Sequence, residues 1–413
     1  MGRRLLAHLL FLPNVMPLTA LLKAEIFPWA TLYGAKGIFD FSKVYKWFLV
    51  FLTLSASWMF FSSGLSLSVV ARSLFAFVNA TIVFFYVVQT KEEEYTWILK
   101  AFERILLINL IIIMLQYFHL FPVFLEPVFQ WFIERFKALP FGEGRGVAGL
   151  FAEPSYAGIS LYYYFAFYMF LHKIPPTSRK GILLLLGVLF VHLLMIRSLA
   201  ALLLLAIYVL FSVEWRQLLR LAVPVVITFL LLVVIFGSSE NAPRALAVPY
   251  SFFANQEFRN PSAWILQESG FRFVSVLGSY AYLLTHPFGA GVGNWQEASL
   301  IGMEMLGVPI DIVDHFANQF DTDFDGVRPY AFLAGLALEG GLLPIILLFF
   351  ALYPYLKIPL WRENQQAKTM LAFFIFTITG FGVIGDPLPF LFLALVVRRD
   401  GLNHLNSGMK EQV

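Results

Sequence analysis

The chain has 413 residues, of which 59% are hydrophobic and only 13% charged, with a mean hydropathy of +0.76. A soluble domain is about one quarter charged, so this composition excludes an ordinary soluble globular protein. Cysteine is absent, which excludes disulfides, thiolate catalysis and cysteine-ligated metals. The net charge of +3 says little as a total, and we expect no nucleic-acid partner.

Apolar runs of helical length recur from end to end and predict an all-α, polytopic integral membrane protein with about 11–12 transmembrane helices. We treat residues 1–413 as a single transmembrane domain. The apolar start, Leu5 to Leu22, lacks a small-residue cleavage site and is interpreted as a retained membrane segment. Residues 4–35 predict a hairpin or a span plus a re-entrant piece, and both stay open. The clearest spans follow at 46–62, 68–89, 102–120, 155–172, 181–196, 198–212, 219–236, 329–354, 367–384 and 386–397.

Basic residues gather in alternate connections, namely 173–180, 213–220, 357–368 and the tail. The positive-inside rule places these connections on the cytoplasmic side. The opposite face then receives residues 121–154, the tight turn 196–198 and the long loop 237–328. That loop contains no lysine, is acidic, and is predicted to include an amphipathic helix over 271–285. A loop of this length is usually functional.

Four arginines predicted to lie on the extracytoplasmic face are the most informative: Arg145, Arg197, Arg272 and Arg328. Arg145 lies in a glycine-rich segment ahead of a predicted helix, and Arg197 lies in a tight turn between two apolar runs. Arg272 starts the helix predicted over 271–285, and Arg328 precedes a predicted span. The guanidinium fork binds phosphate oxygens bidentately, so we expect an anionic ligand. The alternatives are ordinary surface arginines and, for Arg197, an arginine that extends to the membrane interface.

The sequence DTDFDG at 321–326 matches the start of a calcium-binding loop. The twelfth position of such a loop should be Glu, and here it is Phe332, so the full EF-hand is excluded. A looser divalent site at Asp321, Asp323 and Asp325 stays open beside the alternative of a solvated acidic stretch. Glu339 is expected to be buried and hydrogen-bonded. The glycine-rich turn HPFGAGVGNW follows no strand, which argues against a nucleotide loop.

Four stretches in order resemble the bacterial O-antigen ligase/polymerase superfamily. They are RGVAGLFAEPSYAG (145–158), RSLAALLLL (197–205), the run from Arg272 to THPFGAGVGNW (285–295), and the last loop leading into LALEGGLLP (336–344). The resemblance implies a GT-C-like glycosyltransferase of the bacterial inner membrane, multi-pass, with its active site facing the periplasm and without a cofactor. Loop 237–328 would then be periplasmic.

The resemblance also implies that Arg197 and Arg272 hold the phosphates of an undecaprenyl-pyrophosphate donor, and that Arg145 matches a motif arginine. Ligases carry a His ahead of the last motif, where this chain has Arg328-Pro329-Tyr330, which favours the polymerase branch. Arg328 and Tyr330 are therefore assigned to substrate binding with the other arginines.

We expect the chain to polymerise lipid-linked oligosaccharide repeat units into O-antigen or a related surface polysaccharide, by glycosyl transfer to a sugar hydroxyl. The general-base candidates, unranked, are Glu153, Glu268, His315 and Asp325. One alternative is an O-antigen ligase that uses lipid A–core or another terminal acceptor. An alternative of another class is a lipid-linked oligosaccharide transporter or flippase. Expected partners are undecaprenyl-pyrophosphate-linked glycans, membrane lipid and, by resemblance, a chain-length regulator protein.

Overall fold

The computed structural model describes residues 2–16, 28–141, 146–212, 226–227, 229–239, 242, 244–254, 271–307 and 328–401. Regular structure in these ranges is helical, apart from an isolated antiparallel bridge between Val15 and Ile133. The predicted all-α class is therefore confirmed.

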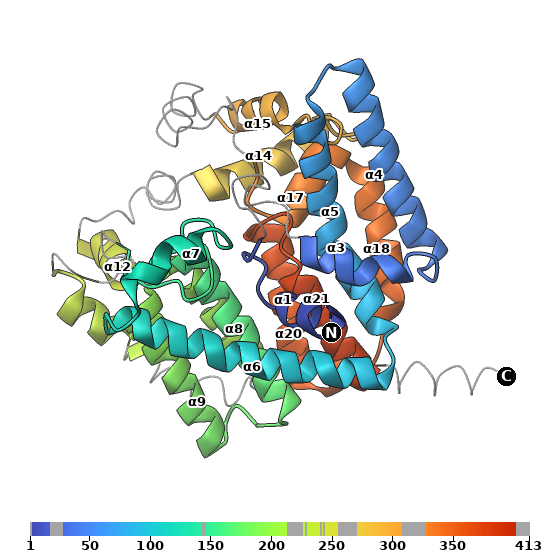
Figure 1. The fold of residues 1–413 in the computed structure, drawn as a ribbon. Helices are drawn as coiled ribbons and strands as arrows, with labels where there is room; N and C mark the ends of the chain where they lie inside the picture. Colours follow the sequence, from blue (N-terminus) through green and yellow to red (C-terminus); the bar gives the residue numbers. More distant parts are fainter. Residues whose placement is uncertain are drawn as a thin grey trace.

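The α-helices of the described ranges are shown in Figure 1: α1 (Gly2–Leu9), α3 (Pro28–Gly34), α4 (Lys43–Ser62), α5 (Leu67–Val88), α6 (Glu92–Tyr117), α7 (Glu126–Gln130), α8 (Pro154–Leu171), α9 (Arg179–Phe190), α10 (Leu199–Ser212), α12 (Arg244–Ala254), α14 (Phe271–Thr285), α15 (Trp295–Glu304), α17 (Phe332–Gly335), α18 (Leu342–Leu356), α19 (Leu360–Glu363), α20 (Gln365–Gly380) and α21 (Leu388–Val396). Short 3-10 or π-helical turns accompany them: η1 (Ala35–Gly37), η2 (Val123–Leu125), η3 (Val191–Ile196), η5 (Leu336–Gly340) and η6 (Val397–Gly401).

Several helices begin where the sequence supplies a serine. Ser42, Ser66 and Ser178 each accept a hydrogen bond on their side-chain oxygen from the amide three residues further on. Such caps satisfy amides that have no partner inside the helix. They fix the starts of α4, α5 and α9.

Among the described residues, three helical segments are long and apolar enough to cross a membrane: Lys43–Ser62, Leu67–Val88 and Arg179–Ile196. They coincide with three of the predicted spans. The span predicted at 102–120 lies in α6, which begins ten residues earlier and crosses the direction of α5 steeply (Figure 1). Of the span predicted at 219–236, only 226–227 and 229–236 belong to the described residues, and these are helical. Within the loop 237–328, α14 occupies the residues predicted for the amphipathic helix.

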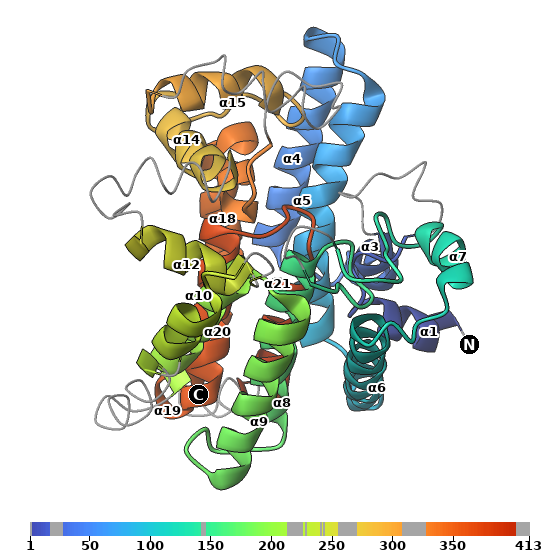
Figure 2. The ribbon, with the colours of Figure 1, turned by 90° about the vertical axis from the view of Figure 1, so that its left-hand side faces the viewer.

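Helix α8 is the central element of the bundle. Fifteen of its 18 residues are buried, and it contacts α9, α10, α20 and α21. Figure 2 shows α8, α10 and α20 close together in the turned view. A Cβ at Gly158 would lie 2.7 Å from the Cβ of Ala201, so the missing side chain lets α10 pack closely. At 1.5 Å per residue the two ends of α8 are about 27 Å apart, close to the ~30 Å of a bilayer core.

The glycine-rich segment 286–294 docks onto the π-helical turn η5. The amides of Ala290 and Gly291 donate to the carbonyls of Leu338 and Glu339, each at 2.8 Å. Carbonyls at the end of a helix lack partners inside the helix, and the amides of this loop act as their hydrogen-bond donors. Gly341 ends the turn with φ +74°, and a Cβ there would lie 2.3 Å from the carbonyl carbon of Phe288. The glycines of this segment therefore serve close backbone packing.

We predict opposite effects for two glycine substitutions. Gly341→Ala should lower the free energy of unfolding by about 2–3 kcal/mol. The added Cβ would clash with the backbone of Phe288, and an alanine is strained at the positive φ of this position. Gly187→Ala is the matched control, since that position lies inside α9 with no atom within 4 Å of the added Cβ. The control should be neutral or slightly stabilising, because alanine favours helix. Thermal unfolding of the purified protein in detergent measures both, and equal midpoints would contradict the role of Gly341.

Candidate functional site

The candidate site forms around Glu153, the residue that immediately precedes α8. Its backbone is extended, with φ −146° and ψ 154°, and its side chain does not cap the helix. Nη2 of Arg272, in the first turn of α14, donates to its Oε2 at 3.2 Å. Nη1 of Arg135 donates to its Oε1 at 2.5 Å. The Arg272 guanidinium also lies over the ring of Tyr330, 4.9 Å from its centroid. We call Arg135, Glu153, Arg272 and Tyr330 the arginine–glutamate cluster.

The carboxylate of the cluster is covered, whereas its cations are accessible. The Glu153 side chain is 14% exposed, compared with 44% for Arg272 and 61% for Arg135. Burial alone would raise the pKa of Glu153, but the positive charges of Arg272 and Arg135 and their hydrogen bonds outweigh it and lower the pKa. Glu153 is therefore ionised at neutral pH. Glu134 also lies close enough to act on the charge of Arg135. The exposed parts of the two guanidiniums, rather than a net charge, are what suit an anionic ligand.

Arg197 occupies a turn that a buried histidine holds. Its backbone is left-handed, with φ 57°, and its amide donates to the carbonyl of His192 at 2.6 Å. Nε2 of His192 contacts the carbonyl of Ser198 at 2.6 Å. A carbonyl can only accept, so Nε2 carries the proton and Nδ1 accepts from the Tyr162 hydroxyl, 2.8 Å away. Single π-turns of this kind often occur at functional sites.

The Arg197 turn lies at the same end of α8 as the cluster. A Cβ at Gly158 would lie 3.0 Å from the Cβ of Ser198, and Gly158 is only five residues, about 7 Å of helix, beyond Glu153. The segment leading into α8 also packs against this turn, because the amide of Val147 donates to the Met195 carbonyl at 2.8 Å. Nε of Arg197 donates to the Leu194 carbonyl at 2.9 Å, and among the described residues its terminal amino groups have no recorded partner.

Arg328 occupies a different environment from the other predicted arginines. It is 9% exposed, and its Nη2 contacts Oε1 of Glu339 at 3.1 Å and Oγ of Ser73 at 3.0 Å. Glu339 is fully buried, and its Oε2 accepts from the Gly293 amide at 2.7 Å. The expectation of a buried, hydrogen-bonded Glu339 is confirmed. Arg328 thus neutralises an internal carboxylate, and it fixes the chain two residues ahead of Tyr330.

The remaining predicted site residues lie outside the described part of the chain and stay predictions: Arg145, Glu268, His315, Asp321, Asp323 and Asp325. Arg145 directly precedes Gly146, whose added Cβ would meet the carbonyl oxygens of Met195 and Ile196. Among the residues that the structure describes, no three His, Asp or Glu side chains gather as a metal site.

Sequence reasoning missed Arg135. It lies in the connection 121–154, on the face where the positive-inside rule predicts few cations. Unlike Arg145, it is not surrounded by glycines, so the pattern that singled out Arg145 did not mark it. Its left-handed backbone, φ 60°, and its pairing with Glu153, 18 residues away, had no sequence signal.

Acid should weaken the cluster. Because the pKa of Glu153 is lower in the folded protein than in an unfolded chain, its ionisation stabilises the fold at pH values above its ordinary pKa. This stabilisation is lost as the pH falls through the lowered folded value. Thermal midpoints measured from pH 6 downward should fall more for the wild type than for Glu153→Gln. Parallel curves for the two proteins would show that the ion pairs do not contribute.

The buried pair should behave as a unit. Arg328→Met and Glu339→Gln each leave an unpaired buried charge, which costs about 3–5 kcal/mol. The double variant should lose clearly less than the sum of the two, because neither charge remains. A double-mutant cycle of unfolding in detergent measures this coupling. Additive losses would mean that the two side chains do not depend on each other.

No family model matches this chain, and no curated protein matches it. Function is therefore inferred from the residues and their contacts.

Proposed function

We propose that this chain is a GT-C-like glycosyltransferase of the bacterial inner membrane, with about 11–12 transmembrane helices. It would polymerise undecaprenyl-pyrophosphate-linked repeat units at the periplasmic face. The observation that carries the proposal is the placement of two arginines, Arg272 and Arg197, at one end of α8. The Arg272 side chain is 44% exposed and is oriented by Glu153. The turn that carries Arg197 is held by the buried His192, and Nε of Arg197 donates to the Leu194 carbonyl.

The reaction would be a single displacement. The oxygen of an acceptor sugar hydroxyl forms a bond to the anomeric carbon of the donor, and the bond from that carbon to the pyrophosphate oxygen breaks. The hydroxyl proton passes to a general base, and undecaprenyl pyrophosphate leaves with the bonding electrons. Negative charge grows on the leaving oxygen in the transition state. Guanidiniums directed at that oxygen stabilise the transition state more than the bound substrate.

Glu153 fits a positioning role better than that of the base. It is ionised, but both carboxylate oxygens already accept from arginines and its lowered pKa makes it a weak proton acceptor. Its contacts instead fix the Arg272 guanidinium, whose face is covered by Tyr330. The N–H groups of the Arg272 guanidinium that do not contact Glu153 are then directed at phosphate oxygens. The base would come from the remaining candidates, Glu268, His315 and Asp325.

The position of the charges separates a transferase from a carrier. Carriers usually hold ionisable groups in broken helices near the bilayer midplane. Here Arg135, Glu153 and Arg272 gather beyond the first residue of α8, and Arg197 lies within about two turns of it. This arrangement favours chemistry on a lipid-linked phosphate at one face. A ligase would use the same donor site, so only the acceptor distinguishes it.

Neutralising the donor-site arginines should stop chain growth. Arg272→Ala and Arg197→Ala should each reduce the rate of polymerisation by about 10²–10³, the usual loss when one transition-state donor is removed. The control is Arg179→Ala, which removes an exposed arginine from the opposite end of the α9–η3 segment. Purified protein would receive undecaprenyl-pyrophosphate-linked repeat units, and the products would be separated on a gel.

A ladder of multiples from the wild type and the control, but not from the two variants, is the expected result. Wild-type ladders from both Arg→Ala variants would overturn the proposal. If the wild type gives no ladder but transfers glycan to lipid A–core, the ligase alternative replaces the polymerase. Glu153→Gln should lower kcat and leave KM closer to the wild-type value, as expected of a residue that orients a catalytic group.

A further inference from the structure

A small basic cavity lies between α1 and α6, far from the arginine–glutamate cluster. It has a volume of about 260 Å³ and is lined by Arg4, His8, Trp97, Lys100 and Arg104. Lys100 also lines a larger neighbouring cavity together with Leu171 and His172, which end α8. The basic cavity is therefore near the opposite end of α8 from Glu153, about 27 Å away along that helix.

The lining of the basic cavity contains three cationic side chains, an imidazole and an indole, and it includes no carboxylate. Arg4 lies over the Trp97 ring at 4.1 Å, and this contact holds its guanidinium at the cavity wall. Nδ1 of His8 donates to the Arg4 carbonyl at 2.7 Å. The nearby carboxylate of Glu94 is directed to Arg3 instead, at 3.6 Å. The charge of the basic cavity is thus left for an outside anion.

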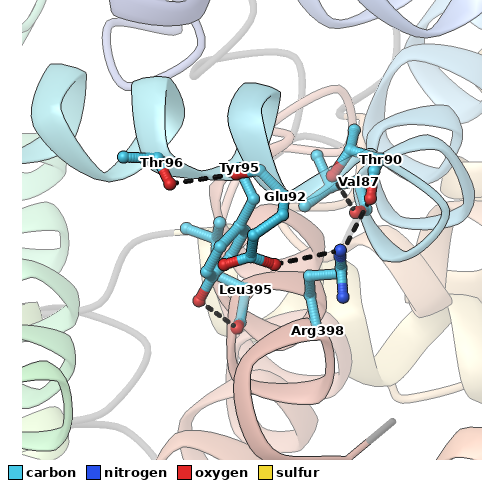
Figure 3. Close-up of polar contacts among 7 residues, drawn as sticks. All are labelled: Val87, Thr90, Glu92, Tyr95, Thr96, Leu395 and Arg398. Atoms are coloured by element: carbon cyan, nitrogen blue, oxygen red, sulfur yellow. Dashed lines mark hydrogen bonds and ion pairs between the residues drawn. The ribbon is translucent and has the colours of Figure 1, made fainter.

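The larger cavity, of about 650 Å³, does not offer the same charge. Figure 3 shows that Arg398 donates to Oε2 of Glu92 at 3.2 Å and to the carbonyl of Thr90 at 3.0 Å. On the other wall, Nε2 of His172 lies 3.3 Å from Oε1 of Glu103. The Arg398 guanidinium of the larger cavity is paired with Glu92, and two carboxylates, Glu92 and Glu103, belong to its lining. An anion would therefore bind more favourably in the basic cavity, which is lined by no carboxylate.

The basic cavity continues into an apolar stripe on α6. Leu107, Ile111 and Met114 are exposed, and they follow Lys100 and Arg104 at helical spacings of three and four residues. These spacings place all five side chains on one face of the helix. From Arg104 to Met114 the stripe runs about 15 Å. A basic head followed by an apolar track of that length has the outline of a phospholipid.

We propose that this cavity binds the phosphate headgroup of an anionic phospholipid, with an acyl chain lying along the exposed α6 stripe. Basic pockets beside membrane helices bind such headgroups through charge and hydrogen bonds. The lipid would tie α1 to α6, two helices that already pack together. This is a site separate from the proposed glycan donor site.

Binding can be tested on the purified full-length protein in detergent. Phosphatidylglycerol, phosphatidylcholine and inorganic phosphate would be titrated separately, with retained lipid counted by native mass spectrometry and Trp fluorescence followed in parallel. Lys100→Gln/Arg104→Gln should weaken phosphatidylglycerol binding by roughly 10–100-fold, since each basic residue near a charged group contributes up to about tenfold. Arg4→Gln should act in the same direction. The control, Arg179→Gln/Lys180→Gln, removes two exposed charges that line neither cavity.

Preference for phosphatidylglycerol over phosphatidylcholine, lost in the cavity variants and kept in the control, supports the proposal. If inorganic phosphate binds as tightly as phosphatidylglycerol, the proposal is overturned in favour of a free-phosphate site. An equal loss in the control variant would show attraction by overall charge only, and an unchanged affinity in Lys100→Gln/Arg104→Gln and Arg4→Gln would remove the site altogether.

Discussion

One buried carboxylate constrains much of the surrounding structure. Glu339 has no exposed surface, so its charge must be neutralised inside the protein. Arg328 supplies the opposite charge, and the Gly293 amide and Ser73 complete the set of partners. These partners come from α5, the glycine-rich loop and the segment ahead of α17. Neutralising one group thus brings three distant parts of the chain together, and it leaves Tyr330 beside Arg272.

The charged assemblies are arranged around α8. The buried residues of α8 are apolar apart from Ser160 and several tyrosines that find internal partners. One of these is Tyr163, whose hydroxyl donates to Thr377 at 3.0 Å. The ionic groups lie just beyond its ends, with Glu153 before the first residue and His172 after the last. A helix without a polar face cannot hold charges along its length. Charged chemistry is thereby confined to the two ends.

Local signals predicted the helices well. Apolar runs located α4, α5 and α8 to within a few residues, and the amphipathic pattern located α14, because these features depend on neighbouring residues. The site was harder to predict. Arg272 was found as a cation in an acidic loop, but its partner Glu153 is 119 residues away. Arg328 was assigned to substrate binding, and only the folded chain reveals Glu339 beside it. Charge type was readable from the sequence, whereas charge pairing depends on tertiary contacts.

The shared carboxylate of Glu153 has a consequence for turnover. A pyrophosphate product carries more charge than a neutral glycan, and guanidiniums that bind the transition state tightly also tend to retain that product. Glu153 stays next to Arg272 and Arg135 throughout, as a resident counter-ion. When the product separates, both guanidiniums would keep Glu153 as a hydrogen-bond partner, so their N–H groups would not all be left unsatisfied. In the proposed enzyme, the group that orients the arginine would also ease release of the spent lipid carrier.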